Sequence, residues 1–240
     1  MKPSAIIIGA SSGIGLELCR YLVTKDYRIG IAARRKPLLD EMAASLTQIC
    51  CVSEIDAARP DEAIQCFKSM TRAVAPVDFV YICAGTGHPN PDLKWEPEDE
   101  TIRVNALGFA ALASTAMSYF LKQGHGHLVG ITSVAAVRGS SDAPAYGATK
   151  AFESHYLESL RIRARKSGVP ISVTEIRPGF VKTAMMKAEK PFWVASPVVA
   201  ARQIVAAAEA RKSIAYVTAR WRLVAWLMRM LPNMIYDRVA

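Results

Sequence analysis

The sequence is poor in the residues that build metal centres and disulfide frameworks. It has 240 residues and 5 cysteines, at positions 19, 50, 51, 66 and 83, and none of them forms a C-x-x-C pair. An odd number with two adjacent members is typical of reduced thiols in a cytosolic protein. Of the 4 histidines, only His125 and His127 lie close together, and we expect a loop there. We therefore predict no metal site.

Long apolar runs are also missing. No uninterrupted apolar segment reaches the roughly 18 residues that a membrane-spanning helix needs. The opening MKPSAIIIGA has one lysine and a short apolar stretch that runs into glycines. A secretory signal would need about 7–15 apolar residues and a cleavage site. We expect a mature, cytoplasmic start.

Acidic residues are outnumbered, with 21 Asp and Glu against 30 Lys and Arg, which gives a net charge of +9. Basic clusters occur in RIRARK and RWRLVAWLMR, and such clusters can bind nucleic acid. The first cluster is also explained by a helix C-terminus, where cations complement the helix dipole. We expect no nucleic-acid partner.

Short apolar runs alternate with amphipathic stretches along the whole chain. The runs are rich in β-branched residues, as expected for strands covered on both faces, and predict strands over 4–9, 28–33, 49–55, 77–84, 126–132, 170–176 and 214–217. The stretches between them predict helices over 14–25, 37–46, 59–74, 100–123, 146–167 and 196–212. This alternation favours a single α/β domain over residues 1–240, with a doubly wound, Rossmann-type parallel sheet of about seven strands flanked by helices. Ligands bind beyond the C-terminal ends of such strands.

A glycine-rich loop, GASSGIG, follows the first expected strand directly. Gly9, Gly13 and Gly15 allow a tight turn and a close backbone approach to a pyrophosphate, and the following helix N-terminus favours an anion. The second expected strand ends in IAARRK, without the carboxylate that holds an NAD ribose. Arginine suits a 2′-phosphate instead, so we predict NADP(H), with Arg34 as the main contact beside Arg35.

A tyrosine and a lysine four residues apart open a later expected helix, in YGATK. Tyr146 and Lys150 share one helix face. Ser133 ends the strand just before, and Asn105 lies in an otherwise apolar helix, where its amide needs a buried partner. A phenol loses its proton only near pH ~10 in water, and a neighbouring ammonium favours the phenolate. These four residues form our candidate catalytic group.

At this point the chain resembles the short-chain dehydrogenase/reductase family, from GASSGIG through CAG, Asn105, Ser133 and YGATK to RPGFVKT. The resemblance implies hydride transfer between NADP(H) and a small-molecule carbonyl or secondary alcohol. It makes Tyr146 the general acid/base, Ser133 the group that orients the substrate oxygen, Lys150 a ligand of the nicotinamide ribose, and Asn105 the holder of a water. The implied cofactor contacts are Gly9, Ser11, Ser12, Gly13, Ile14, Gly15, Arg34, Arg35, Asp56, Ala84, Gly85, Tyr146, Lys150, Pro178, Gly179, Val181 and Thr183.

Two regions set the expected substrate and partners. Residues 184–196 resemble the family's substrate lid, and Met185, Met186, Phe192 and Trp193 would give it an apolar inner surface or pack it onto the body. We expect a lipophilic substrate. The apolar and basic tail over 219–240, with Arg222, Ala225, Trp226 and Arg229 on one helical face, would pack on the body, contact another subunit or lie on a membrane surface.

The resemblance also implies a homodimer or homotetramer, and its departures leave alternatives open. ICAG, with Ile82 and Cys83, replaces the family's NNAG, so local hydrogen bonds should differ while Cys83 packs as an inert thiol. A nucleotide-sensing binding protein with little turnover would share this fold. A sugar-nucleotide epimerase would share the Tyr/Lys pair, although only about sixty residues follow RPG. We expect a cytoplasmic protein, peripheral at a membrane if the tail binds one.

Overall fold

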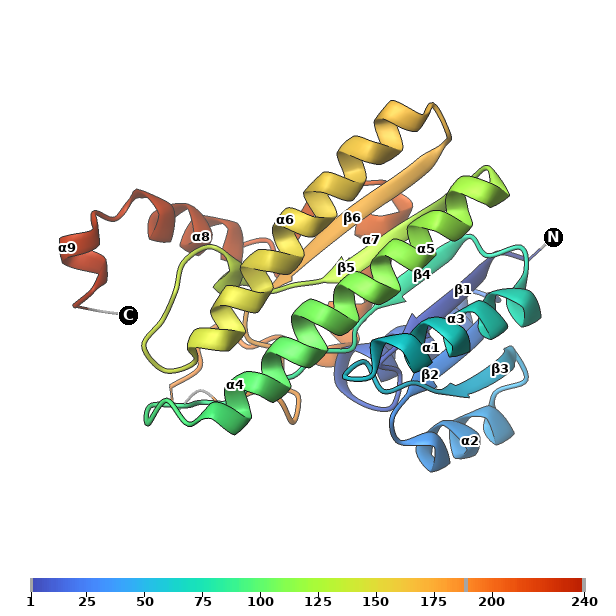
Figure 1. Ribbon diagram of the computed structural model, residues 1–240, viewed down its shortest axis with the longest axis horizontal. Coiled ribbons are helices and arrows are strands. Elements are labelled where there is room, and N and C mark those ends of the chain that lie inside the picture. Colours follow the sequence, from blue (N-terminus) through green and yellow to red (C-terminus); the bar gives the residue numbers. More distant parts are fainter. Residues whose placement is uncertain (1, 188–189, 239–240) are drawn as a thin grey trace.

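A seven-stranded parallel sheet forms the centre of the computed structural model, which describes residues 2–187 and 190–238. The strand order is β3-β2-β1-β4-β5-β6-β7, as expected for a doubly wound fold (Figure 1). Each predicted strand is present within about two residues at either end. The strands are β1 (Ser4–Ile8), β2 (Arg28–Ala33), β3 (Ile49–Glu54), β4 (Phe79–Ile82), β5 (Gly126–Ile131), β6 (Ile171–Pro178) and β7 (Ile214–Val217).

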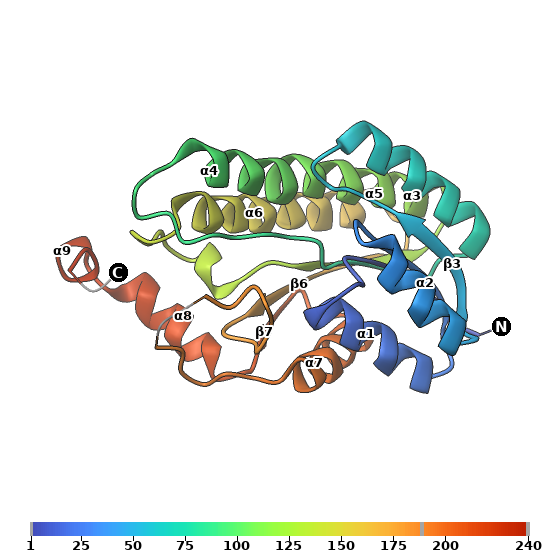
Figure 2. The same cartoon turned by 90° about the horizontal axis from the view of Figure 1, so that it is seen from below.

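Helices cover both faces of the sheet in three layers (Figure 2). One face carries α1 (Gly13–Thr24), α2 (Lys36–Ser45) and α7 (Pro197–Glu209), and the other carries α3 (Pro60–Val74), α5 (Phe109–Gln123) and α6 (Pro144–Ser167). Each face has its own hydrophobic core. In β1, Ile7 enters one core and Ile6 the other, and both are fully buried. Continuous apolar strands are therefore what this architecture requires.

The helix boundaries follow the expected chemistry. Ser196 accepts a hydrogen bond from the backbone N–H of Val199 (3.2 Å) and Pro197 opens α7, so Ser196 caps this helix. At their C-terminal ends, α5 and α6 stop at Gly124 and Gly168, both left-handed.

The helix before β5 is longer than predicted. It begins at Trp95 with α4 (Trp95–Ile102), continues through a π-helical turn, η1 (Arg103–Gly108), and joins α5. The stretch Trp95–Gln123 is long and apolar enough to cross a membrane by composition alone, but half of its apolar window is buried inside the molecule. This is the behaviour of a core helix, here packed against α3 and α6.

Two short helices follow β7 and project from one end of the molecule (Figures 1 and 2). They are α8 (Trp221–Met230) and α9 (Asn233–Tyr236). Trp221, Ala225 and Tyr236 are buried, so part of the tail packs on the body. Ala225 therefore belongs to the buried face, whereas Arg222, Trp226 and Arg229 are exposed.

The π-helical turn depends on a glycine at its end. A Cβ on Gly108 would lie 2.0 Å from the carbonyl oxygen of Ala57, in the loop after β3. Because this atom is backbone, it cannot move aside cheaply. The missing side chain thus lets the turn that carries Asn105 approach the ends of the strands.

Gly108→Ala should lower the free energy of unfolding by about 1–3 kcal/mol, because the new methyl group overpacks this contact. At Gly139, a Cβ would meet nothing within 4 Å and φ is not positive. Gly139→Ala should therefore change stability by less than ~0.5 kcal/mol. Urea unfolding followed by tryptophan fluorescence checks both, and equal effects would contradict the argument.

Candidate active site

The site lies between β1 and β4, where the order in which the chain adds strands to the sheet reverses. From β1 the chain builds outward to β2 and β3, then returns to place β4 on the other side of β1. Connections leaving β1 and β4 therefore diverge, and this is where a doubly wound sheet binds ligands. A Cβ on Gly9 would lie 2.6 Å from the backbone nitrogen of Ala84, so the two connections are in contact here.

The glycine loop forms a close-packed cradle at this point. Gly9 has φ of 92°, and a Cβ on Gly15 would lie 2.2 Å from the carbonyl oxygen of Gly9. Gly13, at φ 56°, faces the side chain of Thr183. Helix α1 starts at Gly13, so its free N–H groups point at the loop. These features fit the pyrophosphate of a dinucleotide.

The two arginines after β2 divide between the loop and a neighbouring pocket. Arg35 donates to the hydroxyl of Ser11 (2.9 Å) and to that of Ser12 (2.6 Å). Arg34 lines a pocket of about 300 Å³ together with Asp56 and lies 3.7 Å from Glu100. Arg35 is therefore in contact with the glycine loop. Arg34 lies in the neighbouring pocket, and its role as the main contact of a 2′-phosphate stays a prediction.

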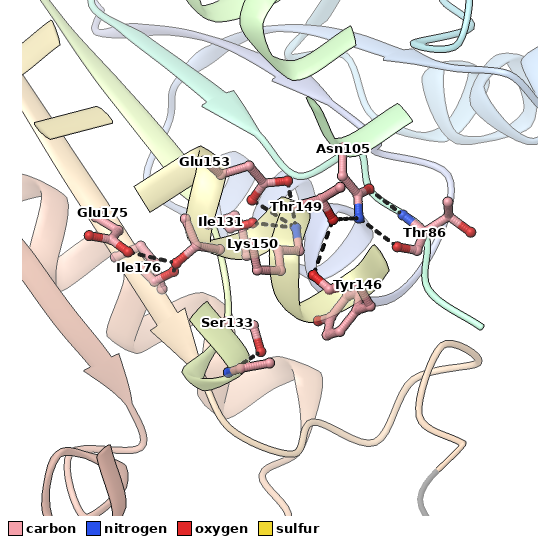
Figure 3. A network of polar contacts seen from close by, with 12 residues as sticks. Thr86, Asn105, Ile131, Ser133, Tyr146, Thr149, Lys150, Glu153, Glu175 and Ile176 are labelled. Carbon is pink, nitrogen blue, oxygen red and sulfur yellow. Dashed lines mark hydrogen bonds and ion pairs between the residues drawn. The ribbon is translucent and has the colours of Figure 1, made fainter. Parts of the chain in front are cut away.

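Asn105 ties three segments together, as its buried amide required. Its Oδ1 accepts from the backbone N–H of Thr86 (2.9 Å), and its Nδ2 donates to the Thr86 carbonyl (2.8 Å) and to the Thr149 hydroxyl (3.1 Å). Asn105 has no exposed surface. It thus fixes the connection after β4 against the first turns of α6 (Figure 3).

Lys150 is buried and held by a carboxylate that the sequence analysis missed. Its Nζ lies 2.9 Å from both Glu153 oxygens and donates to the carbonyl of Ile131 at the end of β5 (3.2 Å). A Cβ on Gly85 would lie 3.3 Å from the same Nζ, so the CAG segment leaves room for the ammonium. Only the i, i+3 spacing of Lys150 and Glu153 could have indicated this pair.

Tyr146, in α6, and Ser133, at the start of a short 3₁₀ helix, complete the candidate catalytic group. The half-buried ring of Tyr146 lies in the first turn of α6, with its centroid 5.8 Å from Nζ of Lys150. A Cβ on Gly87 would lie 2.4 Å from this ring. Ser133 caps the short 3₁₀ helix η2 (Val134–Ala136), and its hydroxyl accepts from the N–H of Ala135 (3.1 Å). Figure 3 shows the four predicted residues gathered at this end of the sheet.

A second ion pair extends the polar network beneath Lys150. Arg177 donates to both oxygens of Glu175 (2.7 and 3.0 Å) and to the Ser154 hydroxyl (2.8 Å), and Thr132 donates to Glu175 (3.0 Å). Burial raises the pKa of Glu153 to about 7, against the lowering effect of Lys150, and the charge of Glu175 raises it further. Burial disfavours the Lys150 ammonium, but the charges of Glu153 and Tyr146 outweigh it and raise the pKa of Lys150.

The predicted lid leaves the sheet just after β6. Val181 pairs with Ala195, which closes the base of the segment between them, and residues 188–189 lie outside the described part. Pro178 ends β6, and a Cβ on Gly179 would lie 1.9 Å from the indole of Trp221. Phe192 packs on Trp221, with ring centroids 4.9 Å apart. Pro178, Gly179, Val181 and Thr183 therefore line one side of the same strand-end region.

Comparison with known proteins decides the family. The sequence profile of the short chain dehydrogenases matches residues 3–192. The chain belongs to the short-chain dehydrogenase family. An uncharacterized oxidoreductase of Myxococcus xanthus is 36% identical over 188 residues, covering 76% of this chain and 73% of that protein. An uncharacterized oxidoreductase of Mycobacterium tuberculosis is 30% identical over 250 residues, covering 100% and 98%.

Solved structures of short-chain dehydrogenases have the same fold. One from Burkholderia cenocepacia in complex with NADP gives a TM-score of 0.85 at 19% identity, covering 99% of this chain and 97% of that chain. One from Sphingobium yanoikuyae in complex with NADPH gives 0.79 at 24% identity, covering 96% and 97%. One from Burkholderia phymatum in complex with NAD gives 0.82 at 16% identity, covering 95% and 92%.

Other side chains considered in the sequence have packing roles in this short-chain dehydrogenase. Burial raises the pKa of the Cys83 thiol to about 12, which keeps it protonated. His127 lies in β5 rather than in a loop, and its ring is 2.8 Å from the Thr174 hydroxyl. Among the described residues, no three His, Cys, Asp or Glu side chains are arranged to hold a metal ion.

Glu153 should titrate near neutral pH in the folded protein. Its pKa of about 7 lies above the ordinary 4.5, so the folded chain holds this proton more tightly than the unfolded chain. The Glu153 contribution to the free energy of unfolding should therefore fall as pH rises from about 4.5 to about 7, and stay level above. ¹³C NMR of glutamate carboxyls should show one group titrating near 7, absent in Glu153→Gln. A Glu153 signal that titrates below 4.5 would contradict this, because the Glu153 contribution to the free energy of unfolding would then rise with pH.

Proposed function

We propose that this oxidoreductase uses NADP(H) to transfer a hydride to or from a lipophilic carbonyl or secondary alcohol. The observation that carries the proposal is the convergence of Tyr146, Lys150, Ser133 and Asn105 beside the glycine loop. The residues come from η1, the end of β5 and the start of α6, and all meet at the C-terminal ends of the strands. Such a group provides a proton donor and an oxygen-binding hydroxyl next to a dinucleotide cradle.

The geometry of the glycine loop fits the pyrophosphate of a nicotinamide dinucleotide. The backbone contacts at Gly9 and Gly15 leave no room for a Cβ, and the N-terminus of α1 opens onto the loop. Ser11, Ser12 and Ile14 would border the pyrophosphate, and Asp56 and Ala84 would border the adenosine. When bound, the nicotinamide supplies or accepts the hydride.

The proton comes from the chain itself. In the direction of reduction, Tyr146 Oη donates its proton to the substrate oxygen, and in oxidation the phenolate takes it back. The ammonium of Lys150 favours the phenolate, and Ser133 donates a hydrogen bond that orients the substrate oxygen. Asn105 positions Thr149 and Thr86 around this group. The proton transfer is therefore assigned to Tyr146, and the hydrogen bond to the substrate oxygen is assigned to Ser133.

Cofactor preference rests on the end of β2. Ala33 occupies the place of an NAD-type carboxylate, and two arginines follow. A guanidinium binds a 2′-phosphate through charge-assisted bonds. Since related folds are solved with NADP, NADPH and NAD, the arginines of this chain, rather than its fold, support NADP(H).

Substrate class rests on the aromatic side chains around the lid. Phe180, Phe192, Trp193 and Trp221 form one cluster, with neighbouring ring centroids 4.9–6.1 Å apart. An aromatic wall beside the strand ends favours an apolar substrate.

A homo-oligomer is part of the same proposal, since Ile102, Leu107 and Phe152 are exposed along α4, η1 and α6.

One observation favours a second candidate, a nucleotide-binding protein with little turnover. Glu153 neutralises Lys150, and an ammonium with a carboxylate partner stabilises a phenolate less than a free one. Both candidates bind the dinucleotide, so a measurement of turnover distinguishes the enzyme from the binding protein.

Tyr146→Phe should lower kcat about 100-fold or more, because it removes the proton donor and leaves the ring packing intact. A panel of lipophilic ketones and aldehydes, followed by loss of NADPH absorbance, identifies a substrate and measures the effect. Tyr21→Phe, outside the group, is the matched control and should keep wild-type turnover. If Tyr146→Phe turns over as fast as wild type, the binding protein is the better conclusion.

Arg34→Ala and Arg35→Ala should each weaken NADPH binding about 10- to 100-fold, since each removes a charge-assisted bond worth about 1.5–3 kcal/mol. Binding of NADH should change little, because it lacks the 2′-phosphate. Lys36→Ala is the control, as Lys36 pairs with Asp40 on the exposed side of α2. Fluorescence titration gives the dissociation constants, and equal affinity of wild type for NADH and NADPH would refute the preference.

A further inference from the structure

Helix α8 is apolar on both its inward and its outward face. Trp221 and Ala225 are buried, but Leu223, Trp226 and Met230 on the opposite side are 63%, 58% and 63% exposed. Met234 and Ile235, in the following helix α9, are also exposed. We call this set of exposed apolar side chains the tail patch, and it consists of Leu223, Trp226, Leu227, Met230, Met234 and Ile235.

Packing on the body does not account for the tail patch, because the body already uses the other face. An amphipathic helix on a protein surface normally turns charged groups to water. Here large apolar side chains take those positions, and contiguous patches of this kind mark an interaction surface.

Arginines border the patch, and the segment has little opposing charge. Between residues 219 and 238 the chain has Arg220, Arg222, Arg229 and Arg238 but one acid, Asp237. All four arginines are exposed. At 100° per residue, Arg222 and Arg229 fall beside Trp226 along one edge of the apolar face. Their charge complements an anionic surface.

The body holds the tail in place, so the patch is presented as a fixed shape. Arg138 donates to the carbonyl of Leu231 (2.7 Å) and to Oδ1 of Asn233 (2.8 Å), and its guanidinium lies 3.7 Å from the ring centroid of Tyr236. Tyr236 in turn donates to the carbonyl of Gly139 (2.7 Å). Binding would therefore require little further ordering of the tail.

We propose that the tail patch docks this protein on a membrane surface of anionic lipids. Apolar side chains with Trp at their edge suit the headgroup boundary, and bordering arginines suit anionic headgroups. A second copy of the chain fits less well, because a two-fold contact through this patch would bring together four arginines from each copy against a single acid, Asp237. The cation-rich border thus selects lipid over self-association.

The test is co-sedimentation of the full chain with sucrose-loaded vesicles. Vesicles of phosphatidylglycerol mixed with phosphatidylcholine should bind the protein, and vesicles of phosphatidylcholine alone should bind it about tenfold more weakly. Added salt should weaken the binding to anionic vesicles. Leu223→Ser/Trp226→Ser and Arg222→Gln/Arg229→Gln should each lower the affinity about tenfold or more.

Matched controls change the same kinds of exposed side chain elsewhere. Ile162→Ser/Val198→Ser removes apolar groups from α6 and α7, and Arg163→Gln/Arg165→Gln removes two charges from α6. Both should bind anionic vesicles as wild type does. Circular dichroism and NADPH affinity should be unchanged in all four variants, which shows that each is folded.

Three results would overturn the proposal. These are absence of vesicle binding by wild type, equal binding by the tail-patch variants and the controls, and an oligomer, seen by light scattering, that dissociates only in Leu223→Ser/Trp226→Ser. The last result would assign the patch to a second copy. None of these measurements depends on turnover, so the proposed reaction can fail or hold independently.

Discussion

The buried ammonium of Lys150 is the constraint on which the rest of the site depends. A charge with 4% exposure is tolerable only when partners replace the water it has lost. Glu153 supplies two oxygens and the end of β5 supplies a carbonyl. Removing a partner from such a pair costs about 3–5 kcal/mol, because it leaves the other charge buried and alone. The position of α6 against β5 is therefore fixed by this ion as well as by apolar packing.

Fixing α6 also fixes the groups that work beside the ammonium. Tyr146 lies one turn before Lys150 on the same helix face, and Thr149 lies between them. Through Thr149, Asn105 connects this turn to the segment after β4, and that segment has glycines where Tyr146 and Lys150 come close. The π-helical turn around Asn105 fits the same picture, because π-turns interrupt a regular helix where a side chain must be aimed differently. Regular elements of the sheet and its helices thus hold the candidate catalytic group.

The sequence predicted what short-range patterns determine. Apolar runs such as SAIIIG predicted the strands, and the glycine loop and YGATK predicted which ends of the strands form the site. Glu153 was missed because a carboxylate three residues after a lysine looks the same on a solvated helix face as in a buried pair. The hydrogen bond from Arg138 to the carbonyl of Leu231 joins residues that lie 93 positions apart in the sequence, so it depends on the tertiary fold. The contact of Arg35 with Ser11 and Ser12 depends on the direction of its side chain after β2, which residue spacing does not reveal.

The indole of Trp221 joins the tail to the segment that follows β6. Trp221 packs on Gly179, where any side chain would collide with its indole, and also on Phe180 and Phe192 of the lid region. Arg138, a few residues after Ser133, holds the far end of the tail. The tail is therefore attached at two points that both adjoin the strand ends. Trp221 and Ala225 on the inner face of α8 thus join the tail to the body, and the apolar side chains of the tail patch remain on its outer face.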